Sequence, residues 1–277
     1  MTLPPGHRRA AQGVSTNASR AWLMRQALRR DPRLVVDYVR SFVSAGRGLP
    51  EQSERRPLPG SVDPAAAREL IAHELGAWSD GPSLATVRNR LAAEQHGDDR
   101  GGRMAALMAG DSALGELLYA LVRALRPAVV IETGVATGVT SAHILAALAD
   151  NDAGGLESID LPPGDLISGA LVGSAVPEEL RGRWTYHWST ARRSLPAILR
   201  DTAGGAPRIF VHDSDHSYEN MRWEIETAWR GLKPGDWLVA DDVDLHAAFA
   251  DVAAAVGAAP WLVQQVDEPG TTGLLRR

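Results

Sequence analysis

The sequence predicts an α/β fold with a doubly wound, mostly parallel sheet. Two observations support this prediction. From residue 128 to about residue 256, short apolar runs alternate with stretches of helical periodicity. The first apolar run ends in a glycine-rich turn that opens a new helical pattern, in the segment AVVIETGVATGV at 128–139. Repeated strand–helix–strand units place parallel strands side by side, with helices on both faces of the sheet.

The composition sets the broad class of the protein. At 277 residues and 44% hydrophobic content, the chain suits one sizeable α/β domain with an appendage, or two small domains. No stretch approaches the ~20 apolar residues that span a membrane, and no apolar segment follows Arg8 and Arg9, so export is not expected. The absence of cysteine excludes disulfides, thiolate metal sites and cysteine nucleophiles. We expect a cytoplasmic enzyme that does not associate with membranes.

Charge is unevenly distributed along the chain. The first 60 residues contain 11 arginines and 4 acidic residues, although the net charge of the whole chain is −5. A basic arm can indicate nucleic-acid binding. However, lysine occurs once, at Lys233, so a preference for arginine is a property of the whole sequence and not of this segment. We therefore expect a solvated surface and no nucleic-acid partner.

The first 100 residues are expected to form two parts. Residues 1–16 lack periodicity and are rich in Pro, Gly and Arg, which predicts a disordered arm. Residues 17–100 predict a helical cap or oligomerisation segment that precedes the main domain at 101–277. Because their apolar faces need partners, we expect these helices to cover the strand tips or to build a homo-oligomer, a dimer or a larger assembly.

The helix signals in this segment are local. The pairs Asp31-Pro32 and Asp63-Pro64 each combine an N-cap with a proline at the first helical position. The second pair begins a helix that ends before Gly76, and a linker at 46–62 separates the two. A further helix is expected at 83–94. Two apolar groups should be buried by the earlier helices: Trp22, Leu23 and Leu28, and then Val35, Tyr38, Val39, Phe42 and Val43.

The main domain is expected to begin with a helix capped by Asp111, whose apolar stripe runs from Leu114 to Leu125. Five parallel strands follow, at 128–132, 156–160, 184–188, 208–212 and 237–240. Helices are expected at 139–149, 192–200, 218–232 and 246–256. Two last runs, at 261–266 and 272–275, predict a hairpin that adds antiparallel pairing and brings the sheet to seven strands.

Acidic residues end several of these strands, which is where α/β sheets bind ligands. Glu132 precedes the glycine turn, and Asp160 ends the second strand, where an acid can accept hydrogen bonds from ribose hydroxyls. A dinucleotide dehydrogenase would use the same acid but requires G-x-G-x-x-G in the turn. This chain offers only Gly134-x-x-x-Gly138, so the spacing disfavours a nicotinamide-dependent oxidoreductase.

The turn resembles the first motif of class I S-adenosylmethionine-dependent methyltransferases, whose fold is Rossmann-like. The resemblance extends over residues 111–277 and implies S-adenosylmethionine as the cofactor. The implied contacts are Glu132, Gly134, Ala136 and Gly138 for the methionine and ribose side, Thr140 for the carboxylate, Asp160 for the ribose, and Ser189, Thr190 and Ala191 for the adenine.

Two further segments, FVHDSDHSYE at 210–219 and VADDV at 239–243, resemble the metal-dependent small-molecule O-methyltransferases, a group that includes macrolide-sugar enzymes. The resemblance implies a Mg²⁺ ion held by Asp213, Asp241 and Asp242, with Asp213 also near the cofactor. It implies that His216 is the general base, because imidazole accepts a proton near neutral pH. A bound cation would lower the pKa of the acceptor hydroxyl.

Simpler roles are open to the same residues. Asp213 or Asp215 can cap the helix that begins near Ser217. Because side chains alternate along a strand, one of Asp241 and Asp242 is expected to point away from the site. Acidic strand tips also occur in methyltransferases that bind no metal.

Other conspicuous residues favour structural roles. His212 is expected to lie within a strand, and Trp184, Trp188 and Trp229 in the core. Trp223 falls off its helix's apolar stripe and is expected to pack against a neighbouring segment or subunit. The irregular loop at 161–176 can be a cover over the site or a passive surface loop.

We expect an O-methyltransferase that acts, with Mg²⁺, on a hydroxyl of a small metabolite such as a sugar or a natural product. The first alternative is a metal-independent methyltransferase that acts on nitrogen or another acceptor, and metal dependence separates the two. A nicotinamide-dependent oxidoreductase and a non-catalytic binding module are the remaining alternatives. The motifs do not specify the acceptor, because specificity resides in loops and in the N-terminal helices.

Overall fold

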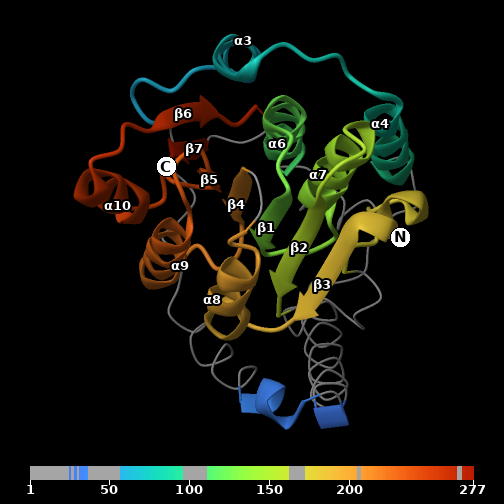
Figure 1. Ribbon diagram of the computed structural model, residues 1–277, viewed down its shortest axis with the longest axis vertical. Helices are drawn as coiled ribbons and strands as arrows, with labels where there is room; N and C mark the ends of the chain where they lie inside the picture. Colours follow the sequence, from blue (N-terminus) through green and yellow to red (C-terminus); the bar gives the residue numbers. More distant parts are fainter. Residues whose placement is uncertain are drawn as a thin grey trace, which may run out of the picture.

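The computed structural model describes residues 25, 28–29, 31–36, 57–95, 111–161, 172–204, 207–266 and 270–277. Within that part, the chain forms one seven-stranded sheet with helices on both faces (Figure 1). Several predictions lie outside the described residues: the arm at 1–16, the burial of Trp22 and Leu23, the apolar face beyond residue 36, most of the linker, and the middle of the loop at 161–176.

The sheet has the predicted content and strand directions. Its order is β3-β2-β1-β4-β5-β7-β6. The first five strands are parallel, β7 pairs antiparallel with β5, and β6 pairs antiparallel with β7. This confirms the doubly wound sheet with a C-terminal hairpin. The strands are β1 (Val129–Thr133), β2 (Gly155–Asp160), β3 (Trp184–Trp188), β4 (Arg208–His212), β5 (Trp237–Ala240), β6 (Trp261–Gln264) and β7 (Thr271–Arg276).

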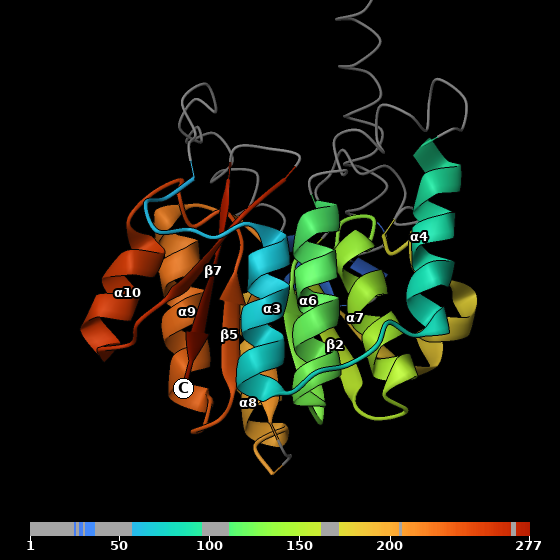
Figure 2. The same cartoon turned by 90° about the horizontal axis from the view of Figure 1, so that it is seen from above.

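Helices cover both faces of the sheet (Figure 2). One face carries α3 (Pro64–Leu75), α4 (Pro82–Gln95), α6 (Asp111–Leu125) and α7 (Val139–Asp150). The other carries α8 (Ala191–Asp201), α9 (Tyr218–Gly231) and α10 (Ala248–Val256). Their ends lie within two residues of the predicted ones. Among the residues that the structure describes, no helix is both long and apolar enough to cross a membrane.

The two predicted Asp-Pro signals both form N-caps. The Asp63 carboxylate accepts a hydrogen bond from the N–H of Ala66 at 3.0 Å, and the Asp31 carboxylate accepts one from the N–H of Arg33 at 2.8 Å. Asp111 differs slightly from the prediction, because α6 begins at Asp111 itself rather than one residue later. Local capping chemistry therefore locates most of these helix starts correctly.

The helices that precede the main domain extend the layer formed by α6 and α7. Ile71 of α3 and Val87 of α4 are buried in the same hydrophobic cluster as Leu118 of α6. Arg88 of α4 donates from Nε and Nη2 to the two carboxylate oxygens of Glu116 at 2.6 and 2.7 Å. Thus α3 and α4 share the core of the main domain and lie on a face of the sheet, not over the strand tips.

A different part of the N-terminal segment lies at the strand tips. Residues 31–36 lie beyond the carboxyl ends of β2 and β3 (Figure 1), where Arg193 of α8 donates to the Asp31 carboxylate at 3.0 Å. Leu34 is buried there. Leu28, in contrast to its predicted burial, is 60% exposed, because no described segment packs over it.

Trp184, Trp223 and Trp229 have the predicted structural surroundings, whereas Trp188, which was also expected in the core, is half-buried and belongs to neither hydrophobic cluster. Trp184 packs against the cluster on the α6–α7 face, and Trp229 is buried on the opposite face. The guanidinium carbon of Arg192 in α8 lies 4.6 Å from the ring centroid of Trp223. Trp223 therefore packs against a neighbouring helix, which satisfies the expectation drawn from its position off the apolar stripe.

A buried ion pair holds the start of β4. The Arg208 and Asp236 side chains are 1% and 6% exposed. Arg208 donates from Nε and Nη2 to Asp236 Oδ2 at 3.0 and 2.7 Å, and its own N–H donates to Oδ1 at 2.8 Å. The carbonyl oxygens of Leu199 and Gly231 accept the remaining guanidinium hydrogen bonds. The pair thus ties β4 to the ends of α8 and α9.

Removing the acid of this pair should destabilise the fold strongly. In Asp236→Ala the Arg208 guanidinium stays buried without its counter-charge, and we expect the free energy of unfolding to fall by about 3–5 kcal/mol. Asp201→Ala, at a pair whose side chains are 72% and 68% exposed, is the control, with a change within about 0.5 kcal/mol. Urea denaturation measures both, and equal losses would contradict the prediction.

Candidate active site

The glycine turn after β1 has no room for a side chain at either of its two glycines. Gly134 has φ +86°, and its N–H donates to the carbonyl of Ile159 at 2.9 Å. A Cβ on Gly134 would lie 1.8 Å from the carbonyl oxygen of Asp213. Gly138, also at φ +86°, is the N-cap of α7, and a Cβ there would lie 2.8 Å from Gly173 Cα. Close approach of the main chain therefore requires glycine at both positions.

Asp160 closes this turn from the tip of β2. Its Oδ2 accepts hydrogen bonds from the N–H groups of Val135 and Ala136 at 3.3 and 3.2 Å. Ala136 has φ +47°, a left-handed conformation that is uncommon for alanine. Burial raises the pKa of Asp160 to about 6, although the hydrogen bonds from Ala136 and Val135 oppose the shift. The carboxyl group lies beside the turn, where the sequence predicts a contact with ribose.

The end of the loop after β2 also lies against the glycine turn. The N–H of Gly173 donates to the carbonyl of Ala136 at 3.1 Å, and the N–H of Ala175 donates to that of Thr137 at 2.9 Å. Arg181 donates in turn to the carbonyl of Gly173 at 2.8 Å. The described end of the loop is thus a wall of the turn and is held to it by main-chain hydrogen bonds.

Glu132 is fully buried beneath the turn. Its Oε2 accepts hydrogen bonds from Ser141 Oγ of α7 at 2.7 Å and Ser158 Oγ of β2 at 2.6 Å. Trp184 Nε1 donates to Ser158 Oγ at 2.9 Å. These contacts brace the first turn of α7 against β1 and β2. A direct contact of Glu132 with the cofactor stays a prediction.

The other predicted cofactor residues lie at the same tips. Thr140 is buried, and its Oγ1 donates to Asp213 Oδ2 at 3.4 Å. The N–H of Ser189 donates to the carbonyl of Asp160 at 3.1 Å, and Thr190 is the N-cap residue of α8. The structure therefore gathers these residues around the turn, while their contacts with a cofactor stay predictions.

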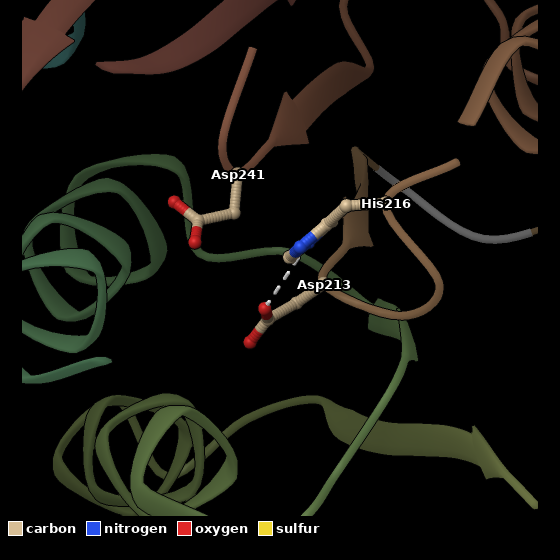
Figure 3. Close-up of side chains that lie close together, drawn as sticks. All are labelled: Asp213, His216 and Asp241. Carbon is tan, nitrogen blue, oxygen red and sulfur yellow. Dashed lines mark ion pairs between the residues drawn. The ribbon is translucent and has the colours of Figure 1, made fainter. Parts of the chain in front are cut away.

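A cluster of metal-binding type follows β4 and β5. Donor atoms of Asp213, His216 and Asp241 all lie within 4.8 Å of one another. Figure 3 shows Asp213 and His216 facing one another from the loop after β4, with Asp241 beside them at the end of β5. His216 Nε2 lies 3.8 Å from Asp213 Oδ1. Asp241 is 7% exposed, so this edge of the cluster is shielded from solvent.

Asp242 lies outside this three-residue group among the described residues. It has φ +54°, and its Oδ2 is 3.3 Å from Nδ1 of His216. Gln265 holds both acids, because its Nε2 donates to Asp241 Oδ1 at 2.8 Å and to Asp242 Oδ1 at 3.1 Å. Thr272 Oγ1 also donates to Asp241 Oδ1 at 2.9 Å. Sequence reasoning missed Gln265 and Thr272, both of the C-terminal hairpin region.

The His216 imidazole is neutral at physiological pH. Burial lowers its pKa to about 4, and the charge of His212 acts in the same direction, although Asp242 opposes the shift. The two imidazole rings meet edge to face with centroids 5.5 Å apart. Nε2 of His216 is buried and has no hydrogen-bond partner among the described residues. A neutral ring leaves a lone pair for a proton or a metal ion.

Sequence reasoning also missed Glu224 of α9, whose side chain is 1% exposed. Its carboxylate joins four groups from β1, β4, the following loop and α9: Thr133 Oγ1 at 2.6 Å, His212 Nδ1 at 2.7 Å, Ser214 Oγ at 2.9 Å and Asn220 Nδ2 at 3.0 Å. Glu224 therefore fixes the loop that carries Asp213 and His216.

The burial of Glu224 could have been predicted from the helical pattern of the sequence. This residue lies three positions after Met221 and four before Ala228, on the buried stripe of α9. An acid on a buried face needs polar partners. Burial alone would raise the pKa of Glu224, but the charge of His212 and the hydrogen bonds bring it below the ordinary value. His212 thus has the structural role predicted for it.

Comparison with known families assigns the class of this protein. Residues 131–243 match a family model described as a methyltransferase domain. The matched segment contains the glycine turn, Asp160 and the whole acidic cluster. The match identifies residues 131–243 as a methyltransferase domain, and S-adenosylmethionine is the cofactor that the sequence motifs imply. The chain is thus an enzyme built around a methyltransferase domain, as its sequence motifs imply. No curated protein matches the sequence.

Solved methyltransferases share this fold at low sequence identity. The O-methyltransferase TomG from Streptomyces achromogenes is 15% identical, with 82% of this chain and 98% of that chain covered and a TM-score of 0.46. An O-methyltransferase from Bacillus cereus is 17% identical, covering 76% and 97%, with a TM-score of 0.48. A methyltransferase from Podospora anserina is 10% identical, covering 76% and 94%, with a TM-score of 0.49.

A methyl group at Gly134 should disrupt the turn. In Gly134→Ala the Cβ would overlap the Asp213 carbonyl, and φ +86° is strained for alanine. We expect the affinity for S-adenosylhomocysteine, measured by calorimetry, to fall at least about tenfold. Gly204→Ala is the matched control, because a Cβ there meets nothing within 4 Å. Equal affinities of the two variants would refute the close-approach argument.

The raised pKa of Asp160 predicts a pH dependence of cofactor binding. In the predicted contact, ribose hydroxyls would donate to the ionised carboxylate, and the free protein loses that form as the pH falls through about 6. The affinity for S-adenosylhomocysteine should therefore be full near pH 8 and fall below pH 6, by up to about tenfold per pH unit. Asp160→Asn should bind more weakly with a flat profile. A wild-type affinity that is constant from pH 5 to 8 would count against the ribose contact.

Proposed function

We propose that this enzyme transfers the methyl group of S-adenosylmethionine to a hydroxyl oxygen of a small metabolite, such as a sugar or a natural product. One observation carries the proposal. The glycine turn touches the main chain of Asp213, whose carboxylate belongs to the cluster with His216 and Asp241. A methyl donor at the turn would therefore lie next to groups that can bind and activate a hydroxyl.

The reaction assigns a task to each side of this junction. The acceptor oxygen attacks the methyl carbon, and the O–C bond forms as the S–C bond breaks. The hydroxyl proton passes to a neighbouring base or to water, and S-adenosylhomocysteine leaves. The enzyme contributes chiefly by alignment, since a near-attack geometry accounts for much of such a rate enhancement. Asp160 and the glycine turn would hold the donor, and the cluster would hold the acceptor oxygen in line with the methyl group.

The residues of the cluster suit a divalent cation. Two carboxylates and an imidazole converge, and Nε2 of that imidazole is buried without a hydrogen-bond partner among the described residues. Asp213 and Asp241 would hold the ion, which when bound lowers the pKa of the acceptor hydroxyl. The hydroxyl is too weak an acid to ionise unaided near neutral pH. The role of His216 as the base follows from the sequence and stays a prediction.

Binding and turnover can be tested on the purified full-length chain. We expect calorimetry to show binding of S-adenosylmethionine and S-adenosylhomocysteine and no response to NAD or NADP. Radiolabelled methyl groups should reach hydroxylated acceptors in a panel of sugars and polyketides. Nicotinamide binding, or transfer confined to nitrogen acceptors, would contradict the proposal.

The cation can be tested in the same assay. Exhaustive EDTA treatment should abolish methyl transfer, and Mg²⁺ or Mn²⁺ should restore it. Asp241→Asn should reduce the rate about 10²-fold or more with little change in S-adenosylhomocysteine affinity. Asp215→Asn is the control, because Asp215 is exposed and outside the cluster. Transfer at full rate by the stripped enzyme would remove the metal from the mechanism.

A further inference from the structure

The third member of the cluster is an imidazole and not a third carboxylate. Nε2 of His216 lies 3.8 Å from Asp213 Oδ1, and a carboxylate oxygen of Asp241 lies within 4.8 Å of a ring nitrogen. Asp242 Oδ2 lies 3.3 Å from Nδ1 of the same ring. We infer that His216 is a metal ligand through Nε2, with Asp242 as the carboxylate that positions the ring. This inference rests on the cation site of the proposed function and is the alternative to the predicted roles of His216 as base and Asp242 as ligand, which stay predictions.

The distances suit a shared ion. Ligand atoms about 2.1 Å from one metal ion are at most about 4.2 Å apart. His216 Nε2 and Asp213 Oδ1, at 3.8 Å, already satisfy this limit. The widest separation in the group, 4.8 Å at most, needs to close by less than about 1 Å. Ordinary side-chain adjustment provides such a movement.

The surroundings of Nε2 favour a cation over a neutral hydroxyl. The atom is buried and has no hydrogen-bond partner among the described residues, a state that costs free energy until a ligand arrives. Asp213 Oδ1 lies 3.8 Å from it, and a carboxylate oxygen of Asp241 lies within 4.8 Å of a nitrogen of the same ring. A metal ion binds the nitrogen and also balances the negative charges of Asp213 and Asp241. A hydroxyl can hydrogen-bond to the nitrogen but leaves those charges unbalanced.

Asp242 has the position of a second-shell partner of a metal-bound histidine. Such histidines usually direct their other ring nitrogen at a carboxylate, which orients the ring and selects its tautomer. Asp242 Oδ2 lies 3.3 Å from Nδ1 of His216. Gln265 donates to the other oxygen of Asp242 at 3.1 Å and so holds the carboxylate in place. A proton on Nδ1 leaves the Nε2 lone pair directed at the cluster.

A nitrogen in the donor set changes the expected metal. Mg²⁺ prefers oxygen ligands, whereas imidazole suits later transition metals such as Fe²⁺, Ni²⁺ or Zn²⁺, and the affinity of Mn²⁺ for mixed nitrogen and oxygen sites is the lowest of this series. Two carboxylates with one imidazole therefore select a transition metal over Mg²⁺. His216→Asp would restore an oxygen-only set and reduce that preference.

Mn²⁺ is the probe for the experiment, with the full-length chain stripped by EDTA. Electron spin echo spectroscopy of the Mn²⁺ complex should show coupling to an imidazole ¹⁴N, which His216→Ala and His216→Asp should abolish. His187→Ala is the control, because His187 pairs with Glu157 at 2.6 Å on β3, away from the cluster. Asp242→Asn should keep the coupling and weaken Mn²⁺ binding about 10–100-fold.

Competition titrations complete the test. We expect Mg²⁺ to displace Mn²⁺ from His216→Asp at concentrations at least about tenfold lower than from the wild type. Bound Mn²⁺ without nitrogen coupling, or no Mn²⁺ binding at all, would overturn the inference. Calorimetry with S-adenosylhomocysteine on the same samples tests the proposed function separately, since a failure there leaves the ligand assignment standing.

Discussion

The contact between the Gly134 main chain and the carbonyl of Asp213 joins the two sides of the active site. No side chain fits between them. The N–H of Gly134 donates to Ile159, and the N–H of Asp213 donates to Thr133 at 2.9 Å, so the tips of β1, β2 and β4 are bonded together just where they diverge. A movement of the glycine turn must therefore move Asp213 as well. The glycine turn and the acidic cluster are therefore mechanically linked.

Strand β4 supports this junction because a buried acid pairs with a basic residue at each of its ends. Arg208, the first residue of β4, pairs with Asp236, and His212, its last residue, pairs with Glu224. Burying an acid is costly unless several donors satisfy it, and both acids accept several hydrogen bonds. These donors come from β1, β4, the loop after β4, α9 and the turn before β5. The loop that carries the cluster thus begins from a strand whose position is fixed at both ends.

The sequence was sufficient for the sheet and for the place of the site, but not for the contacts within it. Apolar runs and helical stripes are local patterns, and parallel strands bring Asp160, Asp213 and Asp241 to one edge whatever the loops do. Glu224 could have been found as an acid on a buried stripe. Gln265 could not, because its contact depends on how the C-terminal hairpin registers against β5. The position of α3 and α4 could not be predicted either, because an amphipathic pattern does not specify which surface a helix covers.

Adjacent acids after β5 illustrate why the backbone, and not residue type, decides each role. The alternation rule for strands predicted that one of Asp241 and Asp242 would point away. The chain instead turns through a left-handed conformation at Asp242, φ +54°, which carries its carboxylate to the other nitrogen of His216. Asp242 therefore remains near the site but outside the three-residue group. Its negative charge acts on the cluster through an imidazole ring, so two identical neighbours in the sequence have different chemistry in the fold.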